Sequence, residues 1–159
     1  MNKKGFTLIE LLVVIAIIGL LSTLSVVALG SARAKSRDSK RLSDIKQVQT
    51  ALELFYTDQG NYPGDTNLVL GIDTETNRGI CLNAGGFAGA NCENAYMGLV
   101  PKDPQNSGSY IYKYNASEDR LSYTITAQLE KEINGIAGTI TATPSGITGS
   151  GSTAAPAGD

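Results

Sequence analysis

The sequence predicts an α+β protein in which one long N-terminal α-helix, membrane-spanning in its first half, packs against a small antiparallel sheet. Residues 6–29 are apolar apart from a few small polar side chains, with Glu10 as the only charge. No proline interrupts the chain before Pro63, so a helix can continue beyond the apolar run. Apolar and polar residues then alternate over 110–114 and 121–129, as they do in half-buried strands.

The composition restricts the function classes. The chain has 159 residues, enough for one modest domain and an anchor, with 18 Gly and no Trp. The absence of His excludes Ser-His-Asp and Cys-His nucleophile pairs and imidazole-ligated zinc. Residues 31–46 carry six basic and two acidic side chains, whereas five basic and twelve acidic ones follow Lys46. This acidic distal part argues against a nucleic acid as partner, because phosphate binding needs clustered positive charge.

The N-terminal segment predicts a single membrane crossing. About 20 apolar residues suffice to span a bilayer as a helix, and no second run of that length exists. Glu10 stands out because an ionisable group at such a depth costs about 2.5–3.5 kcal/mol on insertion scales. Either its carboxylate lies at the interface and reaches water, or its partner belongs to another molecule.

The leader carries a family resemblance. Residues 1–19, MNKKGFTLIELLVVIAIIG, resemble the signal sequence of type IV prepilins and type II secretion pseudopilins, with a short basic leader, Gly5, Phe6 and the glutamate at position 10. The resemblance implies that prepilin peptidase cuts after Gly5 and methylates the Phe6 amine. It also implies that Glu10 neutralises the amine of a neighbouring copy in a helical homo-oligomer.

The same resemblance implies a location and partners. The chain would sit in the cytoplasmic (inner) membrane as a single-pass protein, meet an inner-membrane assembly platform, and pass into an extracellular or periplasmic filament. The positive-inside rule opposes this topology, because residues 33–46 are more basic than Lys3 and Lys4. An ordinary signal peptide cleaved near Ala32-Arg33-Ala34 is the second alternative, although the apolar run is too long for it. An uncleaved anchor is the third.

The helix is expected to continue past the membrane. Apolar residues recur at steps of three and four and form one stripe, with Leu54 outside it, and Asp58, Gly60 and Pro63 supply a stop. The cations of residues 33–46 could meet lipid head groups, neighbouring subunits or only water. The stripe consists of Leu42, Ile45, Val48, Leu52 and Phe55.

The distal part is expected to be a loop followed by a sheet. Cys81 and Cys92 lie in a Gly/Asn-rich stretch, and a disulfide is the simplest interpretation for an exported chain, with free thiols as the alternative. Residues 93–100 are expected to form one helical turn. Strands are expected at 110–114, 121–129 and 138–143. The stretch from Leu99 to Tyr114 resembles the start of the sheet in type II secretion pseudopilins.

These observations divide the chain into six segments. They are a leader peptide (1–5), a transmembrane or filament-core helix (6–30), its amphipathic continuation (31–58), a loop with the candidate disulfide (59–109), an antiparallel sheet (110–146) and a flexible tail (147–159).

Several weaker signals favour structural interpretations. Asn115-Ala-Ser117 fits the N-glycosylation sequon, but chance explains it better. The carboxylate pairs at 118–119 and 130/132 suit solvated turns and strand ends better than glycoside chemistry. Pseudopilins of type II secretion bind calcium, but the ligands cannot be placed here. No metal and no cofactor are therefore expected.

The resulting functional hypothesis is a structural subunit of a type IV pilus-like filament, and not an enzyme. One alternative is a pseudopilin of a type II secretion system, which shares every feature of the leader. Another is a low-copy tip, adhesion or DNA-uptake pilin, although the distal part lacks a basic aromatic patch. An anchored enzyme would have only generic acids and hydroxyls at its disposal.

Overall fold

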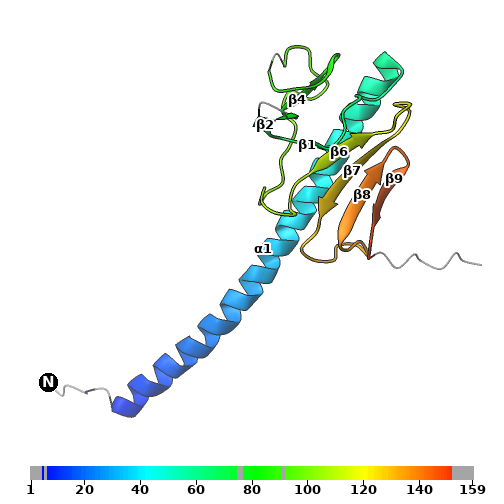
Figure 1. Ribbon diagram of the computed structural model, residues 1–159. Helices are drawn as coiled ribbons and strands as arrows, with labels where there is room; N and C mark the ends of the chain where they lie inside the picture. The colour runs from blue at the N-terminus through cyan, green and yellow to red at the C-terminus, as the bar shows by residue number, and fades with distance from the viewer. Residues whose placement is uncertain (1–4, 6, 75–76, 91, 152–159) are drawn as a thin grey trace, which may run out of the picture. The chain divides into compact units, whose positions relative to one another are not determined.

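The computed structural model describes residues 5, 7–74, 77–90 and 92–151, and the chain divides into two compact units at residues 1–34 and 35–159. One helix, α1 (Leu8–Gln59), begins in the first unit and ends in the second. The second unit, called here the distal unit, contains the sheet and the core (Figure 1). The α+β class predicted from the sequence is confirmed.

Helix α1 ends where the sequence predicts. Gly60 has a φ of 72°, a left-handed conformation that glycine adopts without steric cost, and its N–H donates to the Tyr56 carbonyl at 2.8 Å. Ile45, Val48, Leu52 and Phe55 are all buried, as the apolar stripe predicts. Leu54, the residue outside the stripe, is exposed. Local periodicity therefore determines both the end of the helix and its buried face.

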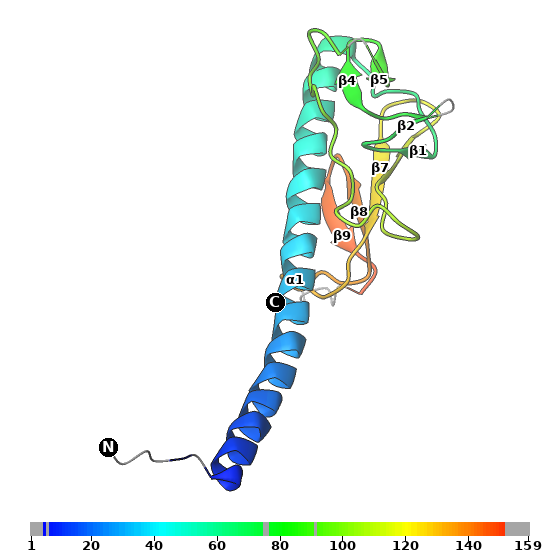
Figure 2. The same cartoon turned by 90° about the vertical axis from the view of Figure 1, so that its left-hand side faces the viewer.

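The main sheet of the distal unit has five antiparallel strands in the order β1-β6-β7-β8-β9. Figures 1 and 2 show β7, β8 and β9 lying along the distal part of α1. Three of the strands match predicted ones in position to within a few residues. The five strands are β1 (Leu68–Val69), β6 (Lys113–Ala116), β7 (Tyr123–Gln128), β8 (Thr139–Thr143) and β9 (Gly146–Gly149).

Strand β7 shows the alternation that the sequence predicts. Tyr123, Ile125 and Ala127 are buried, and the residues between them are half-buried. In register, Tyr114 of β6 lies opposite Ile125, and Ile125 lies opposite Ala142 of β8. The inward residues of three strands thus form one layer against α1, where they join its buried stripe in a single core.

A run of aromatic rings passes through this core. The ring centroids of Tyr56 and Tyr62 are 4.7 Å apart, and those of Tyr62 and Tyr123 are also 4.7 Å apart. Tyr123 then stacks with Tyr114 at 5.9 Å, and Tyr114 meets Phe87 at 5.0 Å. The tyrosines are thus mainly core residues, as strand propensity and packing predict.

The segment between helix and sheet contains more regular structure than expected. Besides β1 it forms two small hairpins, β2 (Asp73–Thr74) with β3 (Asn77–Arg78), and β4 (Cys81–Asn83) with β5 (Gly86–Ala88). The helical turn expected at 93–100 is wrong. Met97 instead exchanges backbone hydrogen bonds with Leu82, so this stretch joins the edge of the β4–β5 hairpin.

Two strand boundaries also differ from expectation. The first long strand begins at Lys113 rather than Tyr110, because a tight turn pairs Ser107 with Tyr110. It extends to Ala116, and the following turn spans 117–122, with Arg120 at a φ of 57°.

Strand β9 includes residues 147–149, which the sequence suggested as tail. Its small residues conceal the strand signal but have a packing reason. A Cβ built on Gly149 would lie 2.6 Å from Ile136 Cγ2, so only glycine fits at this close approach. The remainder of the predicted tail, 152–159, lies outside the described residues.

Candidate functional site: the N-terminal segment and the Arg41 network

The beginning of α1 places two predicted site residues. Gly5 is exposed and precedes the helix, whereas Phe6 lies outside the described residues. Glu10 turns back to Thr7, and its Oε2 accepts hydrogen bonds from the Thr7 backbone N–H at 2.8 Å and from Thr7 Oγ1 at 2.7 Å. The Glu10 N–H donates in return to Thr7 Oγ1 at 3.3 Å.

This arrangement is a capping box, in which a threonine and a glutamate three residues later satisfy each other's backbone N–H groups. The sequence reasoning missed it, although the Thr-x-x-Glu spacing is readable. It gives the Glu10 carboxylate a partner inside its own chain, but both donors are neutral, so the negative charge remains. Both bonds end on Oε2. Among the described residues no hydrogen bond reaches Oε1.

The rest of the first unit offers an apolar surface. The large apolar side chains from Leu8 to Leu29 are exposed, with Leu8 at 78%. Within the part of the chain that the structure describes, α1 is the one helix long and apolar enough to cross a membrane, judged by length and composition. Surface of this kind needs a lipid or protein environment, because water disfavours so large an apolar patch.

A buried arginine organises the distal unit. The Arg41 side chain has no exposed area and lies among acceptors from three segments of the chain. Its Nε donates to Asp103 Oδ2 at 2.7 Å and its Nη2 to Asp103 Oδ1 at 3.0 Å. Its Nη1 donates to Asp38 Oδ1 at 2.6 Å and to Glu130 Oε1 at 2.8 Å. The guanidinium also lies 4.8 Å from the ring centroid of Tyr110, within cation–π range.

The acids around Arg41 bind further donors. Asp38 accepts the backbone N–H groups of Glu130 and Lys131 at 3.0 and 2.8 Å, which fastens the chain after β7 to the helix. Glu130 also pairs with Arg37, whose Nη2 lies 2.5 Å from Oε2. The bonds from Arg37, followed by those from Arg41, lower the pKa of Glu130 to about 2. Glu130 is thus ionised and forms ion pairs with both Arg37 and Arg41.

Burial on its own disfavours the charged form of Arg41, but the bonds to Asp103, Glu130 and Asp38 outweigh it and raise the pKa of Arg41 above its ordinary value. A buried arginine with this number of carboxylate bonds stays protonated at every pH at which the protein folds. The network is therefore a permanent internal clamp between α1, the segment before β6 and the segment after β7.

A second pair extends the clamp. Lys40 Nζ lies 2.9 Å from Asp44 Oδ2, and the Tyr112 hydroxyl donates to the same oxygen at 3.1 Å. Burial and the neighbouring Asp44 raise the pKa of Tyr112. Of the six cations of the basic stretch 31–46, Arg37, Lys40 and Arg41 thus bind acids of their own chain. The sequence could not separate these three from Arg33, Lys35 and Lys46, which are exposed.

The predicted cysteine pair is present. Cys81 of β4 and Cys92 form a disulfide with a Cα–Cα distance of 5.8 Å, so the alternative of free thiols does not apply to this structure. The segment that follows the disulfide lies beside the end of α1. There the Tyr96 ring packs edge-on against Phe55, with ring centroids 5.6 Å apart, and the Tyr96 hydroxyl donates to Asp58 Oδ2 at 2.9 Å.

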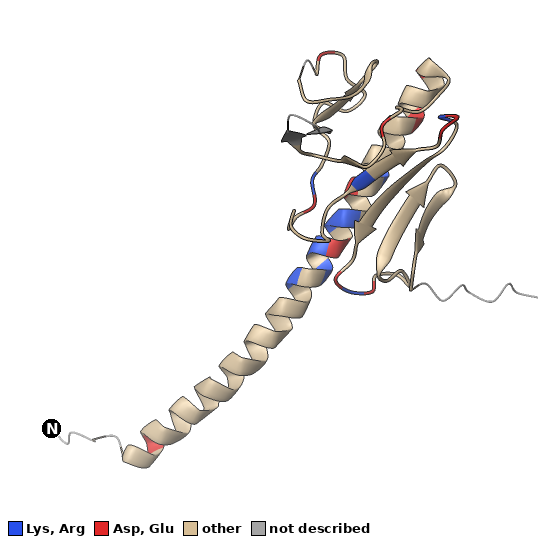
Figure 3. Cartoon of the chain, viewed as in Figure 1, with Lys and Arg blue, Asp and Glu red and all other residues tan. Residues whose placement is uncertain are grey.

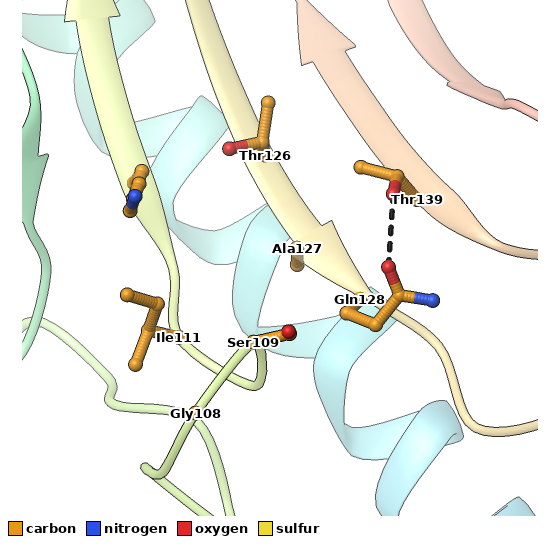
Figure 4. A pocket seen from close by; sticks show the side chains of 8 residues that line it. Gly108, Ser109, Ile111, Thr126, Ala127, Gln128 and Thr139 are labelled. Carbon is orange, nitrogen blue, oxygen red and sulfur yellow. Dashed lines mark hydrogen bonds between the residues drawn. The ribbon is translucent and has the colours of Figure 1, made fainter.

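The outer face of the sheet holds a shallow pocket of about 400 Å³ (Figure 4). Hydroxyl and amide groups dominate its lining, and the Thr139 hydroxyl donates to Gln128 Oε1 at 2.9 Å across two strands. Lys113 is the only charged side chain among its lining residues in the described structure. Among the described residues no group of three His, Cys, Asp or Glu side chains could hold a metal ion.

The remaining polar signals have local explanations. Asn115 lies in β6, and its side-chain oxygen accepts the Asn67 N–H at 2.7 Å. Ser117 Oγ donates to Asp119 Oδ1 at 2.6 Å within the β6–β7 turn. Asn115 and Asp119 thus have structural roles, the first in strand β6 and the second in the β6–β7 turn.

Comparisons with known proteins agree with this description. Residues 1–30 match the family described as "Prokaryotic N-terminal methylation motif", and residues 28–140 match "Type II secretion system (T2SS), protein G". The second match covers more than half of the chain. The chain belongs to the type II secretion protein G family.

Individual relatives of this family member include both secretion and fimbrial proteins. It is 31% identical over 103 residues to a type II secretion system core protein G of Aeromonas hydrophila, which is 65% of this chain and 68% of that one. It is 35% identical over 131 residues to the fimbrial protein EcpC of Eikenella corrodens, covering 74% and 85%. The match to the core protein G of Escherichia coli K12 is 41% over 62 residues, 39% of this chain and 43% of that one. No solved structure matches the chain.

Proposed function

We propose that this protein is a structural subunit of a type IV pilus-like filament that assembles through its N-terminal helix. The observation that carries the proposal is the segment from Gly5 to Leu29, a methylation-type leader followed by an apolar helix with one acid, Glu10. In this scheme prepilin peptidase removes residues 1–5 and methylates the Phe6 amine. The inner-membrane assembly platform then transfers the subunit from the membrane into a filament of identical copies.

Glu10 has a defined physical role in that transfer. The capping box satisfies its hydrogen bonds but leaves its charge, which disfavours the move of α1 from lipid into an apolar core of packed helices. The free Phe6 amine of an adjoining copy supplies a positive charge. Opposite charges 4 Å apart attract by about 4 kcal/mol at an effective dielectric constant of 20. Oε1, to which no residue of the described part of the chain donates, is the oxygen that this amine would approach.

The location of the filament, within the cell envelope or on the cell surface, distinguishes a secretion pseudopilin from a pilus subunit. The match of residues 28–140 to protein G favours a pseudopilin that acts in protein export within the cell envelope. The 85% coverage of a fimbrial protein supports a pilus on the cell surface. Immunogold labelling of intact and sectioned cells separates them, because surface fibres carry the label in one case and the envelope carries it in the other.

Processing is tested by mass spectrometry of the mature protein. The expected first residue is N-methylated Phe6. A chain that begins at Lys35 would instead indicate an ordinary signal peptidase, and a chain that keeps residues 1–5 would indicate an uncleaved anchor. Either result would overturn the proposal.

Assembly is tested with Glu10→Ala and its isosteric control Glu10→Gln. Both variants lose the charge, and Gln keeps a side chain of the same size at the helix start. Both are expected to enter the membrane and to be absent from sheared or purified filaments. Normal filaments from Glu10→Gln would show that the charge is dispensable and would remove the pairing argument.

A further inference from the structure

The two ends of the distal unit differ in the balance of their exposed charges. Figure 3 shows Lys and Arg gathered on the part of α1 near its entry into this unit, whereas the β6–β7 turn carries acids together with one cation. The β6–β7 and β7–β8 connections lie at opposite ends of β7, so the two groups face away from each other. The sequence shows the same polarity as a basic stretch followed by an acidic remainder.

The basic end is formed by the start of the distal helix and the chain after β7. Its exposed cations include Lys35 and Lys131, and the backbone N–H of Lys131 is fixed to Asp38 at 2.8 Å. The acids Asp38 and Glu130 of this end turn inward to Arg41, which leaves Glu132 as the exposed acid beside Lys35. The clamp thus withdraws negative charge from this surface and leaves cations on it.

The acidic end is formed by the last turn of α1 and the β6–β7 turn. The Tyr62 N–H donates to the Arg120 carbonyl at 2.8 Å, which holds these two segments together. Asp58, Glu118 and Asp119 are exposed here and outnumber the one exposed cation, Arg120, whose Nε donates to the Tyr62 carbonyl at 2.8 Å. Among the described residues, neither Asp58 nor Glu118 takes part in an ion pair, and the same holds for Lys35 and Lys131.

We infer that these two surfaces dock to each other between successive copies of this chain, with the basic end of one distal unit on the acidic end of the next. The inference rests on the proposed filament function. The occupant follows from charge complementarity, because each copy carries both the cationic and the anionic surface. Such a contact joins different patches of the two partners, and it propagates as an open helical assembly when the rotation between successive copies does not close a ring.

Exposed pairs of this kind contribute little one at a time and are screened by salt. Their effect lies in register and direction, because a copy docked in the reverse orientation would bring like charges together. Leu, Ile and Val recur along the whole run from Leu8 to Leu29, so apart from the proposed Glu10–Phe6 pair these helices can pack at several axial positions. The charged ends add a second contact that fixes the axial position of each copy.

Reversal of charge at each end tests this inference in the full chain, expressed with its peptidase and assembly platform. Lys35→Glu with Lys131→Glu makes the basic end acidic, and Asp58→Lys with Glu118→Lys makes the acidic end basic. Each double variant is expected to lower the yield of sheared or purified filaments at least about tenfold, because like charges then face each other. The variant with all four changes is expected to recover to within about threefold of wild type.

Lys113→Glu is the control, because Lys113 is exposed between the two ends and its reversal is expected to leave the yield unchanged. Circular dichroism melts in detergent identify any variant that fails to fold. Normal yield from either double variant, or no recovery in a folded fourfold variant, would overturn the docking surfaces. If the docking surfaces are overturned but Glu10→Gln still blocks assembly, the proposed filament function remains supported without them. If the wild-type chain forms no filament, both proposals fail.

Discussion

The Asp103 carboxylate is held by Arg41 through two nearly parallel hydrogen bonds, from Nε at 2.7 Å and from Nη2 at 3.0 Å. Both side chains are fully buried, and the two residues are 62 positions apart in the sequence. The pair thus joins α1 to the segment before β6 without the help of solvent. Pairs of this geometry are among the strongest hydrogen bonds in proteins, and each partner depends on the other for its charge.

Removal of Arg41 is expected to destabilise the distal unit strongly. Arg41→Met keeps an apolar side chain of similar length but leaves the buried Asp103 and Asp38 charges unpaired, which costs about 3–5 kcal/mol. The measurement is urea unfolding of the full chain in detergent, followed by circular dichroism. Lys46→Met is the control, since Lys46 is exposed on the same helix. Equal free energies of unfolding for the two variants would contradict the central role of Arg41.

Glu130 predicts a pH dependence. Its pKa falls from an ordinary 4.5 to about 2 in the folded protein because Arg37 and then Arg41 bind the ionised form. The resulting stability is fully present above about pH 4.5 and is lost as the pH falls toward about 2. The free energy of unfolding of the wild type should therefore decline through this window. Glu130→Gln should lower stability at pH 6 and flatten the decline, whereas an unchanged slope would show that other acids control it.

The disulfide predicts a local effect. Cys81→Ser together with Cys92→Ser opens a loop whose closure stabilises by roughly 2–3 kcal/mol in the chain-entropy model. The expected result is faster proteolysis between β4 and Tyr96, with membrane insertion unchanged. Limited proteolysis followed by mass spectrometry locates the cuts. Cuts at the same positions and rates in the wild type would show that the disulfide does not order this loop.

The capping box predicts a difference between two conservative changes. Thr7→Val removes the hydroxyl that accepts the Glu10 N–H and is expected to cost about 0.5–2 kcal/mol at the helix start. Thr7→Ser retains the hydroxyl and is the control. Amide hydrogen exchange in detergent micelles should accelerate for residues 8–11 in Thr7→Val alone. Identical exchange in both variants would exclude the cap as a stabilising element.

The helix and the central strands were predictable because their signals are local. The stripe through Ile45 and Phe55 and the stop at Gly60 depend on residues a few positions apart, and so does the alternation from Tyr123 to Leu129. Strand β9 was missed because Gly146–Gly149 has almost no apolar pattern, and its pairing follows from close packing on Ile136.

The residues of the candidate site were also predictable only where their sequence signal is local. Gly5, Phe6 and Glu10 can be picked out because they form a short motif, and the two cysteines because no others exist in the chain. Arg41 could not be distinguished from the cations around it. Its burial depends on Asp103 and Glu130, which lie 62 and 89 residues away, and no local pattern records such a meeting.

The aromatic run through the core has an optical consequence. All seven tyrosines lie beyond residue 55 and Trp is absent, so near-ultraviolet absorption and emission come almost entirely from the distal unit. Adjacent rings from Tyr56 to Tyr114 are close enough to exchange excitation energy, and emission therefore reports on this core as a whole. The apolar segment is spectroscopically silent, and a single tryptophan placed there would report its passage from lipid to protein against a dark background.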